Sequence, residues 1–279
     1  MISFPNAKIN IGLNVLEKRK DGFHNIESIF YPVNWCDAIE AIQTEGTGEI
    51  RPTIMGNPVP GSIEDNLCIK AYHLLNEKHK LPSLQLWLLK CIPMGAGLGG
   101  GSADAAFFLK LLNDLFKLDL SIEELKSYAS QIGSDCTFFI DNKPVLVSGI
   151  GNVINPVSFD LSKYYIYIVC PKIHVDTKNA YGLVTPHKKP YSLEQLALSP
   201  IQSWKGNIVN DFEEPIFNMY PDLAEIKNRL YTKGAVYASM TGSGSALYGI
   251  FKKKTYLSDS FPSCKIWTNS PIKQYERFL

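Results

Sequence analysis

The sequence has no long apolar run, no clustered cysteines and no signal-like leader. A helix that crosses a bilayer needs about 20 consecutive apolar residues, and the most apolar segment, residues 84–92, is interrupted by Gln85 and Lys90. The six cysteines form no CxxC pair, which argues against a zinc site and favours reduced thiols in the core of a cytosolic protein. The opening residues lack the apolar stretch of a signal peptide. We therefore expect a cytoplasmic protein with no membrane partner.

Neither positive nor negative charge is in excess. The chain of 279 residues carries 28 Lys and Arg against 27 Asp and Glu, a formal net charge of +1. A protein that binds nucleic acid through a basic surface carries a clear excess of positive charge, so we expect no nucleic-acid partner. An anionic ligand would need groups at its own binding site to compensate its negative charge. Apolar residues make up 45% of the chain, as is usual for globular proteins.

Strand and helix patterns are mixed along the chain without regular alternation, which favours the α+β class. Residues 9–15 alternate apolar and polar positions, as a half-buried strand does, and Lys8 and Asn10 share its polar face. Taken alone, that face would be interpreted as solvated. The S-x-x-D spacing of residues 62–65 predicts a helix start. Apolar residues at helical spacing predict a second helix over residues 105–116.

A change in composition at residues 149–152 marks the predicted domain boundary. The length of the chain suits two domains. We therefore predict an N-terminal domain over residues 1–152 and a C-terminal domain over residues 153–279. The sequence contains no internal repeat and no low-complexity tract.

A glycine-rich loop lies between the apolar segment 84–92 and the following helix. Residues 95–101 include five glycines in seven positions. Glycine has no side chain to block a ligand, and a helix N-terminus offers free N–H groups and the positive end of a dipole. The loop therefore predicts a phosphate site, to which Ser102 adds a hydroxyl.

Two common phosphate-binding classes do not fit this loop. The P-loop pattern GxxxxGK[ST] is absent from the sequence. Residues 95–100 satisfy GxGxxG, but a dinucleotide-binding fold places an acidic residue at the end of a new strand about 20 residues further on. Residues 117–125 instead predict a turn and a capped helix.

Three segments together resemble the GHMP kinase superfamily. They are Pro5-Asn6-Ala7-Lys8-Ile9-Asn10 continued by Lys20-Asp21-Gly22-Phe23-His24, the stretch from Pro93 to Ala106, and Met240-Thr241-Gly242-Ser243-Gly244-Ser245. Within the superfamily, P-x-A-K-x-N followed by D-G-F-H is most similar to the kinases that act on a cytidyl-linked methylerythritol. The resemblance implies an α+β GHMP kinase fold, in which a domain like ribosomal protein S5 domain 2 packs on a ferredoxin-like C-terminal domain.

The same resemblance implies an activity and its site residues. The activity is ATP-dependent phosphorylation of the 2-hydroxyl of 4-diphosphocytidyl-2-C-methyl-D-erythritol in non-mevalonate isoprenoid biosynthesis, with Mg²⁺. Lys8 and Asp135 match the catalytic pair, with Asp135 accepting the hydroxyl proton. The predicted ATP-binding residues are Asn66, Lys90, Pro93, Met94, Gly95, Ala96, Gly97, Leu98, Gly99, Gly100, Gly101, Ser102 and Ala103. The predicted substrate-binding residues are Asn10, Phe23, His24, Thr177, Tyr181, Gly242, Ser243 and Gly244. Phe23 and Tyr181 would stack on the cytosine.

The sequence leaves several points open. Asp104 stands where many relatives carry Asn, and it would either favour the helix dipole or help to hold magnesium. The magnesium ligands and the choice between monomer and homodimer are not determined. Two other functions stay possible: another GHMP small-molecule kinase, for homoserine, mevalonate or a sugar, and a catalytically silent ligand-binding relative.

Overall fold

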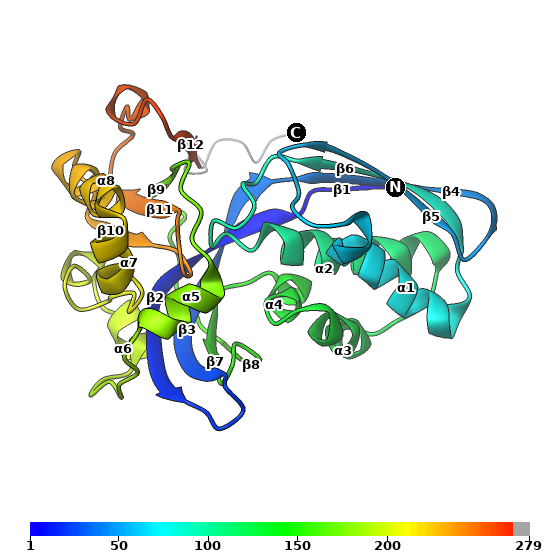
Figure 1. Ribbon diagram of the computed structural model, residues 1–279, viewed down its shortest axis with the longest axis horizontal. Helices are drawn as coiled ribbons and strands as arrows, with labels where there is room; N and C mark the ends of the chain where they lie inside the picture. The colour runs from blue at the N-terminus through cyan, green and yellow to red at the C-terminus, as the bar shows by residue number, and fades with distance from the viewer. Residues whose placement is uncertain (270–279) are drawn as a thin grey trace. The chain divides into compact units, whose positions relative to one another are not determined.

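A computed structural model describes residues 1–269 of the chain (Figure 1). The chain forms two compact units that are interleaved in sequence. The first unit comprises residues 1–8, 34–94 and 99–143, and the second comprises residues 9–33, 95–98 and those from 144 onward. This grouping differs from the consecutive domains 1–152 and 153–279, which remain a prediction from the sequence; the last ten residues of the second lie outside the described part.

The first unit contains a four-stranded sheet and four helices. Its strands, in the spatial order β1-β4-β6-β5, are β1 (Ile2–Ser3), β4 (Ala38–Thr47), β6 (Pro82–Lys90) and β5 (Ile50–Gly56). Its helices are α1 (Leu67–His79), α2 (Gly100–Phe116), α3 (Ile122–Ile132) and α4 (Cys136–Asp141), with a short 3-10 turn at Ile63–Asp65. Helices α1 and α2 lie along one face of the sheet (Figure 1).

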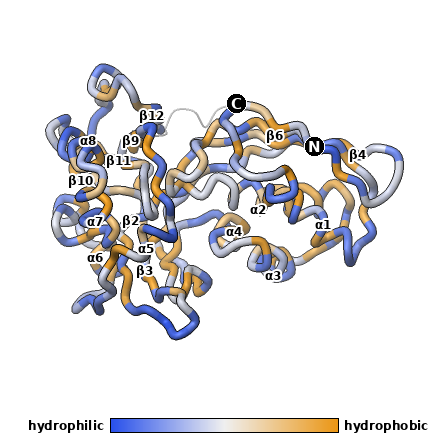
Figure 2. Tube along the Cα trace, in the orientation of Figure 1, coloured by the Kyte–Doolittle hydropathy of each residue, from blue (hydrophilic) through white to orange (hydrophobic). Residues whose placement is uncertain are grey.

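Alternation along β6 explains the core of this unit. Leu84, Leu86 and Leu88 are fully buried, whereas Leu89 on the opposite face is exposed. Successive side chains of a strand point to opposite faces of its sheet, so the three leucines share one face, and Phe108 of α2 is also fully buried. The apolar stretches of β6 and α2 are orange in Figure 2. Each fully buried side chain of this size contributes about 1.5–3 kcal/mol of hydrophobic stabilisation.

Within residues 1–269, two further four-stranded sheets and four helices belong wholly or mostly to the second unit; the first of these sheets includes residues 6–8 and 34–36 of the first unit. The first sheet has the order β2 (Asn6–Lys18), β3 (His24–Cys36), β7 (Val145–Ser148) and β8 (Val153–Pro156). The second has the order β10 (Tyr237–Met240), β11 (Leu247–Phe251), β9 (Tyr165–Cys170) and β12 (Lys265–Thr268). The helices are α5 (Thr177–Leu183), α6 (Leu193–Ala197), α7 (Glu213–Met219) and α8 (Pro221–Thr232), with 3-10 turns at Ile201–Ser203 and Ser258–Ser260.

Helix α8 shows how the sequence builds the second core. Pro221 occupies the first turn, where its missing N–H costs nothing. Leu223, Ile226 and Leu230 recur at helical spacing and are buried in one apolar cluster with residues of β10 and β11. The predicted α+β class is confirmed: the pairs β1–β4, β4–β6, β3–β7, β7–β8, β10–β11, β11–β9 and β12–β9 are antiparallel, and β5 pairs with β6 in parallel. Among the described helices, none has the length and apolar character needed to span a bilayer.

Candidate active site

Lys8 and Asp135 lie together within the first unit. Lys8 Nζ is 3.4 Å from Asp135 Oδ2, and the two side chains are 4% and 27% exposed. Lys8 is part of β2, whereas Asp135 directly precedes α4. A buried ammonium is costly unless a carboxylate compensates it. The structure therefore pairs a hidden cation with a carboxylate that a ligand can reach.

Burial also changes the acidity of the ammonium group. It lowers the pKa of Lys8 below the ordinary 10.5, while the charge of Asp135 and the hydrogen bond to it act in the opposite direction. A lowered pKa means that the ammonium loses its proton at a lower pH than an exposed lysine does. We expect kcat/KM to fall on the alkaline side with an apparent pKa below 10.5. A pH–rate profile checks this.

The matched variant for that profile is Lys8→Arg, because a guanidinium stays charged over the whole range. We expect Lys8→Arg to be less active, because the Lys8 side chain is only 4% exposed and a guanidinium is bulkier than an ammonium group. We also expect its pH–rate profile to show no fall in kcat/KM on the alkaline side. An alkaline limb of the same pKa in both proteins would show that Lys8 is not the titrating group.

The glycine loop begins α2 beside this pair. Gly99 is the N-cap of α2 and has a φ of +72°, a conformation that glycine adopts without strain. A Cβ at Gly99 would lie 3.1 Å from the Phe139 ring and 3.2 Å from Lys8 Cγ. The first N–H groups of a helix have no partner within the helix, so the turn from Gly100 to Ser102 offers donors to an anion.

A cavity of about 100 Å³ adjoins the loop. It is lined by Val59, Pro60, Asp65, Asn66, Leu67, Lys90, Met94, Gly101 and Asp104. Four of the predicted ATP-binding residues, namely Asn66, Lys90, Met94 and Gly101, are thus brought together in one place. Asn66 also caps α1, because its side-chain oxygen accepts a hydrogen bond from the N–H of Cys68.

Lys90 is at the centre of a buried ionic cluster at the base of this cavity. Its ammonium donates hydrogen bonds to both Asp37 and Asp104. Asp37 accepts two further bonds from the main-chain N–H groups of Cys91 and Ile92. The cluster therefore fixes the end of β6 where the chain enters the glycine loop. Nothing in the sequence pattern predicted Asp37, although a lone Asp between two apolar strands was a signal for it.

The buried carboxyl group of Asp104 has a shifted pKa. Burial raises the pKa of its carboxyl well above the ordinary range, the charge of Asp37 acts in the same direction, and Lys90 opposes both. One of its oxygens, Oδ1, has no hydrogen-bond partner in the described part of the chain. The other is bound to Lys90, and no set of three or more His, Cys, Asp or Glu side chains among residues 1–269 is placed to hold a metal ion. The hydrogen bond and ion pair with Lys90 fit a role for Asp104 in holding the Lys90 ammonium in place.

The second unit brings together two of the three residues predicted to bind the base. The rings of His24 and Tyr181 are stacked, with centroids 5.0 Å apart and an angle of 19° between their planes. Burial, and then the charge of Lys18, lower the pKa of His24, so the imidazole is neutral near pH 7 and can both donate and accept a hydrogen bond. Phe23 is 59% exposed, with its ring available to a ligand.

The remaining predicted substrate-binding residues also lie in the second unit. The hydroxyls of Thr177 and Ser243 are 3.0 Å apart, which joins the start of α5 to the loop between β10 and β11. Asn10 is 1% exposed, and its side-chain amide donates to Ser28 Oγ. Thr241 and Asn210, to which the sequence analysis assigned no role of their own, make several contacts in this loop and are considered below.

Comparisons with families and solved structures show which proteins this chain is similar to. The family model described as "GHMP kinases N terminal domain" matches residues 66–143, and that described as "GHMP kinases C terminal" matches residues 193–258. A crystal structure of 4-(cytidine 5'-diphospho)-2C-methyl-D-erythritol kinase has a TM-score of 0.81 and 25% identity, covering 96% of this chain and 98% of that one. The mevalonate kinase of Methanococcus jannaschii shares the fold, with a TM-score of 0.70, 12% identity and coverage of 96% and 97%.

Curated relatives are more similar in sequence. The 4-diphosphocytidyl-2-C-methyl-D-erythritol kinase of Azobacteroides pseudotrichonymphae is 51% identical over 91% of this chain and 94% of its own length. The enzyme of the same name from Parabacteroides distasonis is 48% identical over 96% and 98%. The chain therefore belongs to the GHMP kinase family, and within it to the 4-diphosphocytidyl-2-C-methyl-D-erythritol kinases.

Proposed function

We propose that this chain transfers the γ-phosphoryl group of ATP to the 2-hydroxyl of 4-diphosphocytidyl-2-C-methyl-D-erythritol. The observation that carries the proposal is the position of the Lys8–Asp135 pair. It adjoins the N-terminal turn of α2, since Lys8 Cγ lies 3.2 Å from the position of a Cβ at Gly99. An ammonium, a carboxylate and free main-chain donors in one place are what phosphoryl transfer to an alcohol requires.

In this mechanism Asp135 accepts the proton of the substrate hydroxyl. An aspartate is a weak base toward an alcohol, but the proton becomes acidic as the new O–P bond forms, so position matters more than basicity. Lys8 orients the carboxylate and offsets negative charge on the moving phosphoryl group. The products are ADP and a phosphate monoester, with the proton left on Asp135.

The first unit would contribute the start of α2 and the cavity beside it to the nucleotide site. We propose that the N–H groups of Gly100 to Ser102 bind the phosphates of ATP and that the cavity beside Asn66 and Met94 receives the nucleoside. Magnesium prefers oxygen ligands and keeps several waters, and the hydroxyl of Ser102 at the start of α2 would be one such ligand. When bound with ATP, the ion neutralises charge on the phosphates. A requirement for ATP supports a cytoplasmic location.

The second unit would select the cytidyl group. Phe23, His24 and Tyr181 supply a stacking surface and a neutral imidazole for the edge of a pyrimidine. Base–aromatic stacking is worth about 1–3 kcal/mol per base. Homoserine, mevalonate and simple sugars have no base to use this surface, which is why we favour the cytidyl substrate over these alternatives.

Phe23→Ala tests the stacking surface. Because the ring is 59% exposed, its removal should not disturb packing. Loss of one stacking contact should raise KM for the cytidyl substrate about 10- to 100-fold and leave KM for ATP unchanged. Tyr256→Ala is the control, since Tyr256 is an exposed aromatic of the same unit, 73% exposed, and should change neither constant. Equal effects of the two variants would refute a role for Phe23.

The proposed function itself is tested with a panel of acceptors. The purified protein, ATP and Mg²⁺ are incubated with the cytidyl substrate, homoserine, mevalonate and galactose, and ADP release is measured. We expect kcat/KM for the cytidyl substrate to exceed the others by at least about 10³-fold, the discrimination that several desolvated contacts to the base provide. A preference for another acceptor, or no turnover with any, would reject the proposal.

A further inference from the structure

The hydroxyl of Thr241 is a buried junction between separate segments of the second unit. Thr241 is 0% exposed. Its Oγ1 accepts a hydrogen bond from the N–H of Asn10 at 3.1 Å and lies 3.1 Å from Asn10 Oδ1 and 3.0 Å from the carbonyl oxygen of Gly97, two acceptors for its one proton. One hydroxyl therefore contacts both the polar strand segment near the N-terminus and the first half of the glycine loop.

The main chains are equally close at this point. A Cβ at Gly97 would lie 2.0 Å from the carbonyl oxygen of Thr241, and a Cβ at Gly242 would lie 3.0 Å from Gly97 Cα. In addition, the N–H of Ala246 donates to the carbonyl of Ala96 at 3.2 Å. Glycine at 97 is thus required by contact with residues 241 and 242 as well as by its φ of +78°.

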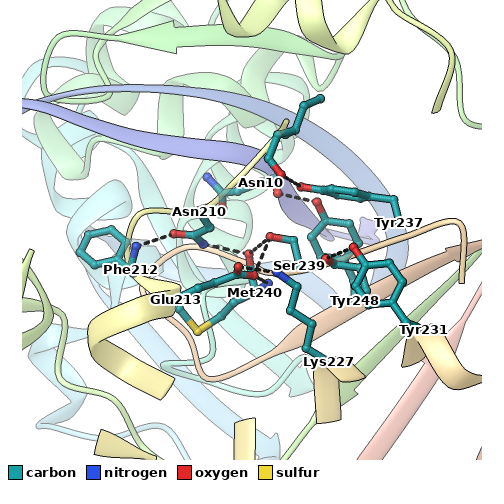
Figure 3. A network of polar contacts seen from close by, with 12 residues as sticks. Asn10, Asn210, Phe212, Glu213, Lys227, Tyr231, Tyr237, Ser239, Met240 and Tyr248 are labelled. Carbon is teal, nitrogen blue, oxygen red and sulfur yellow. Dashed lines mark hydrogen bonds and ion pairs between the residues drawn. The ribbon is translucent and has the colours of Figure 1, made fainter. Parts of the chain in front are cut away.

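Asn210 binds the main chain on both sides of Thr241. Its side-chain Nδ2 donates to the carbonyls of Met240, at 2.9 Å (Figure 3), and Gly242, at 2.8 Å. These are the residues immediately before and after Thr241. The Oδ1 of Asn210 accepts from the N–H of Phe212 at 3.0 Å, which fixes the orientation of the amide. A single carboxamide therefore sets the direction in which the Thr241 hydroxyl points.

A buried carboxylate anchors the strand that leads into this junction. Glu213 is 8% exposed and accepts hydrogen bonds from Ser239 Oγ at 3.0 Å and from the N–H of Met240 at 2.8 Å. Lys227 balances its charge at a distance of 2.5 Å. Figure 3 shows these groups converging on the end of β10. On the other side, Tyr248 donates to the carbonyl of Asn10 at 2.8 Å.

We propose that Thr241 is a positioning residue that holds the first half of the phosphate loop in register with the loop predicted to bind the substrate. This inference rests on the proposed function and on the sequence prediction that residues 95–98 contribute to binding the phosphates of ATP. The hydroxyl is fully buried and has its partners within the chain, so it acts through Gly97 rather than by touching a ligand. Nucleotide affinity and turnover therefore depend on a group that neither substrate reaches.

The test compares Thr241→Val with Thr241→Ser. Valine keeps the shape but removes the hydroxyl, whereas serine keeps the hydroxyl. We expect Thr241→Val to weaken ADP binding about tenfold by calorimetry and to lower kcat about 10- to 100-fold, since a displacement of about 1 Å costs up to two orders of magnitude. Thr241→Ser should stay within about threefold of the parent protein in both. Tyr231→Phe, which removes one bond to the carbonyl of Ala238 in the same network, should match the parent.

The outcomes separate positioning from simple packing. A folded Thr241→Val with parental ADP affinity and kcat, altered only in melting temperature, would overturn the proposal. If Thr241→Val does not fold, Asn210→Ala is the second variant. It removes the hydrogen bonds to the carbonyls of Met240 and Gly242 but leaves the Thr241 hydroxyl. The same losses of ADP affinity and of kcat are expected, and parental values would count against the proposal. ADP binding is measured without the cytidyl substrate, so it tests Thr241 even if the proposed acceptor is wrong.

Discussion

Asp135→Asn should lower kcat about 10³-fold while the affinity for ATP stays within about threefold, because a positioned general base contributes about 10²- to 10⁴-fold. The amide has nearly the same shape as the carboxylate but cannot take up the hydroxyl proton. It also removes the negative charge 3.4 Å from Lys8 Nζ. Single-turnover kinetics with excess enzyme isolates the chemical step, and a titration with a non-hydrolysable ATP analogue reports binding.

Asp141→Asn is the matched control for this variant. Asp141 ends the same short helix, α4, and its carboxylate pairs with Lys126 at 2.7 Å on a partly exposed surface. Its loss changes the net charge equally but touches no group of the proposed mechanism, so kcat should be that of the parent. If Asp135→Asn retained more than about a tenth of the parental kcat, Asp135 would not be the base.

Asp37→Ala should have the largest effect on stability, lowering the free energy of unfolding by about 3–5 kcal/mol, because removing one partner of a buried ionic cluster leaves the others uncompensated. Asp37 is 1% exposed. It binds the Lys90 ammonium and the N–H groups of Cys91 and Ile92, so its removal leaves three buried donors with fewer acceptors. Urea unfolding followed by circular dichroism gives the free energy directly.

An exposed ion pair of the same unit provides the comparison. Glu49 pairs with Arg51 at 2.8 Å, but both side chains are more than half exposed. Pairs of this kind contribute little, because water and salt screen them, so Glu49→Ala should leave the unfolding midpoint unchanged. Equal midpoints for Asp37→Ala and Glu49→Ala would show that the Lys90 cluster does not stabilise this unit.

The glycine loop could be located from sequence alone because its structure is local. A loop of five glycines between a strand and a helix requires only short-range geometry, and the structure places it between β6 and α2 with Gly95, Gly97 and Gly99 at positive φ. The pairing of Lys8 with Asp135 is different. The two residues are far apart in the chain, so no periodicity or spacing brings them together, and only the family resemblance paired them.

Two features show where sequence patterns fell short. The spacing of residues 62–65 predicted a helix start, and its capping box is present, but it closes only a 3-10 turn. Asn66 is extended, with φ of −63° and ψ of 128°, and caps α1 from Leu67 onward. The sequence thus contains two successive capping residues, Ser62 and Asn66, which the prediction treated as the start of one helix. The sequence pattern showed Lys90 as an interruption of an apolar strand, and the family resemblance named it as an ATP-binding residue, but neither predicted its buried ion pairs. Burial of a charge depends on partners, which Asp37 and Asp104 supply from other elements.

The most direct test of the account is to identify the oxygen that receives the phosphate. The protein is incubated with ATP, Mg²⁺ and the cytidyl substrate, and the product is examined by mass spectrometry and by phosphorus and carbon NMR. We expect a gain of one phosphoryl group as a monoester, with coupling that places it on C2 of the methylerythritol. A phosphate on any other oxygen, or on no part of this molecule, would contradict the account.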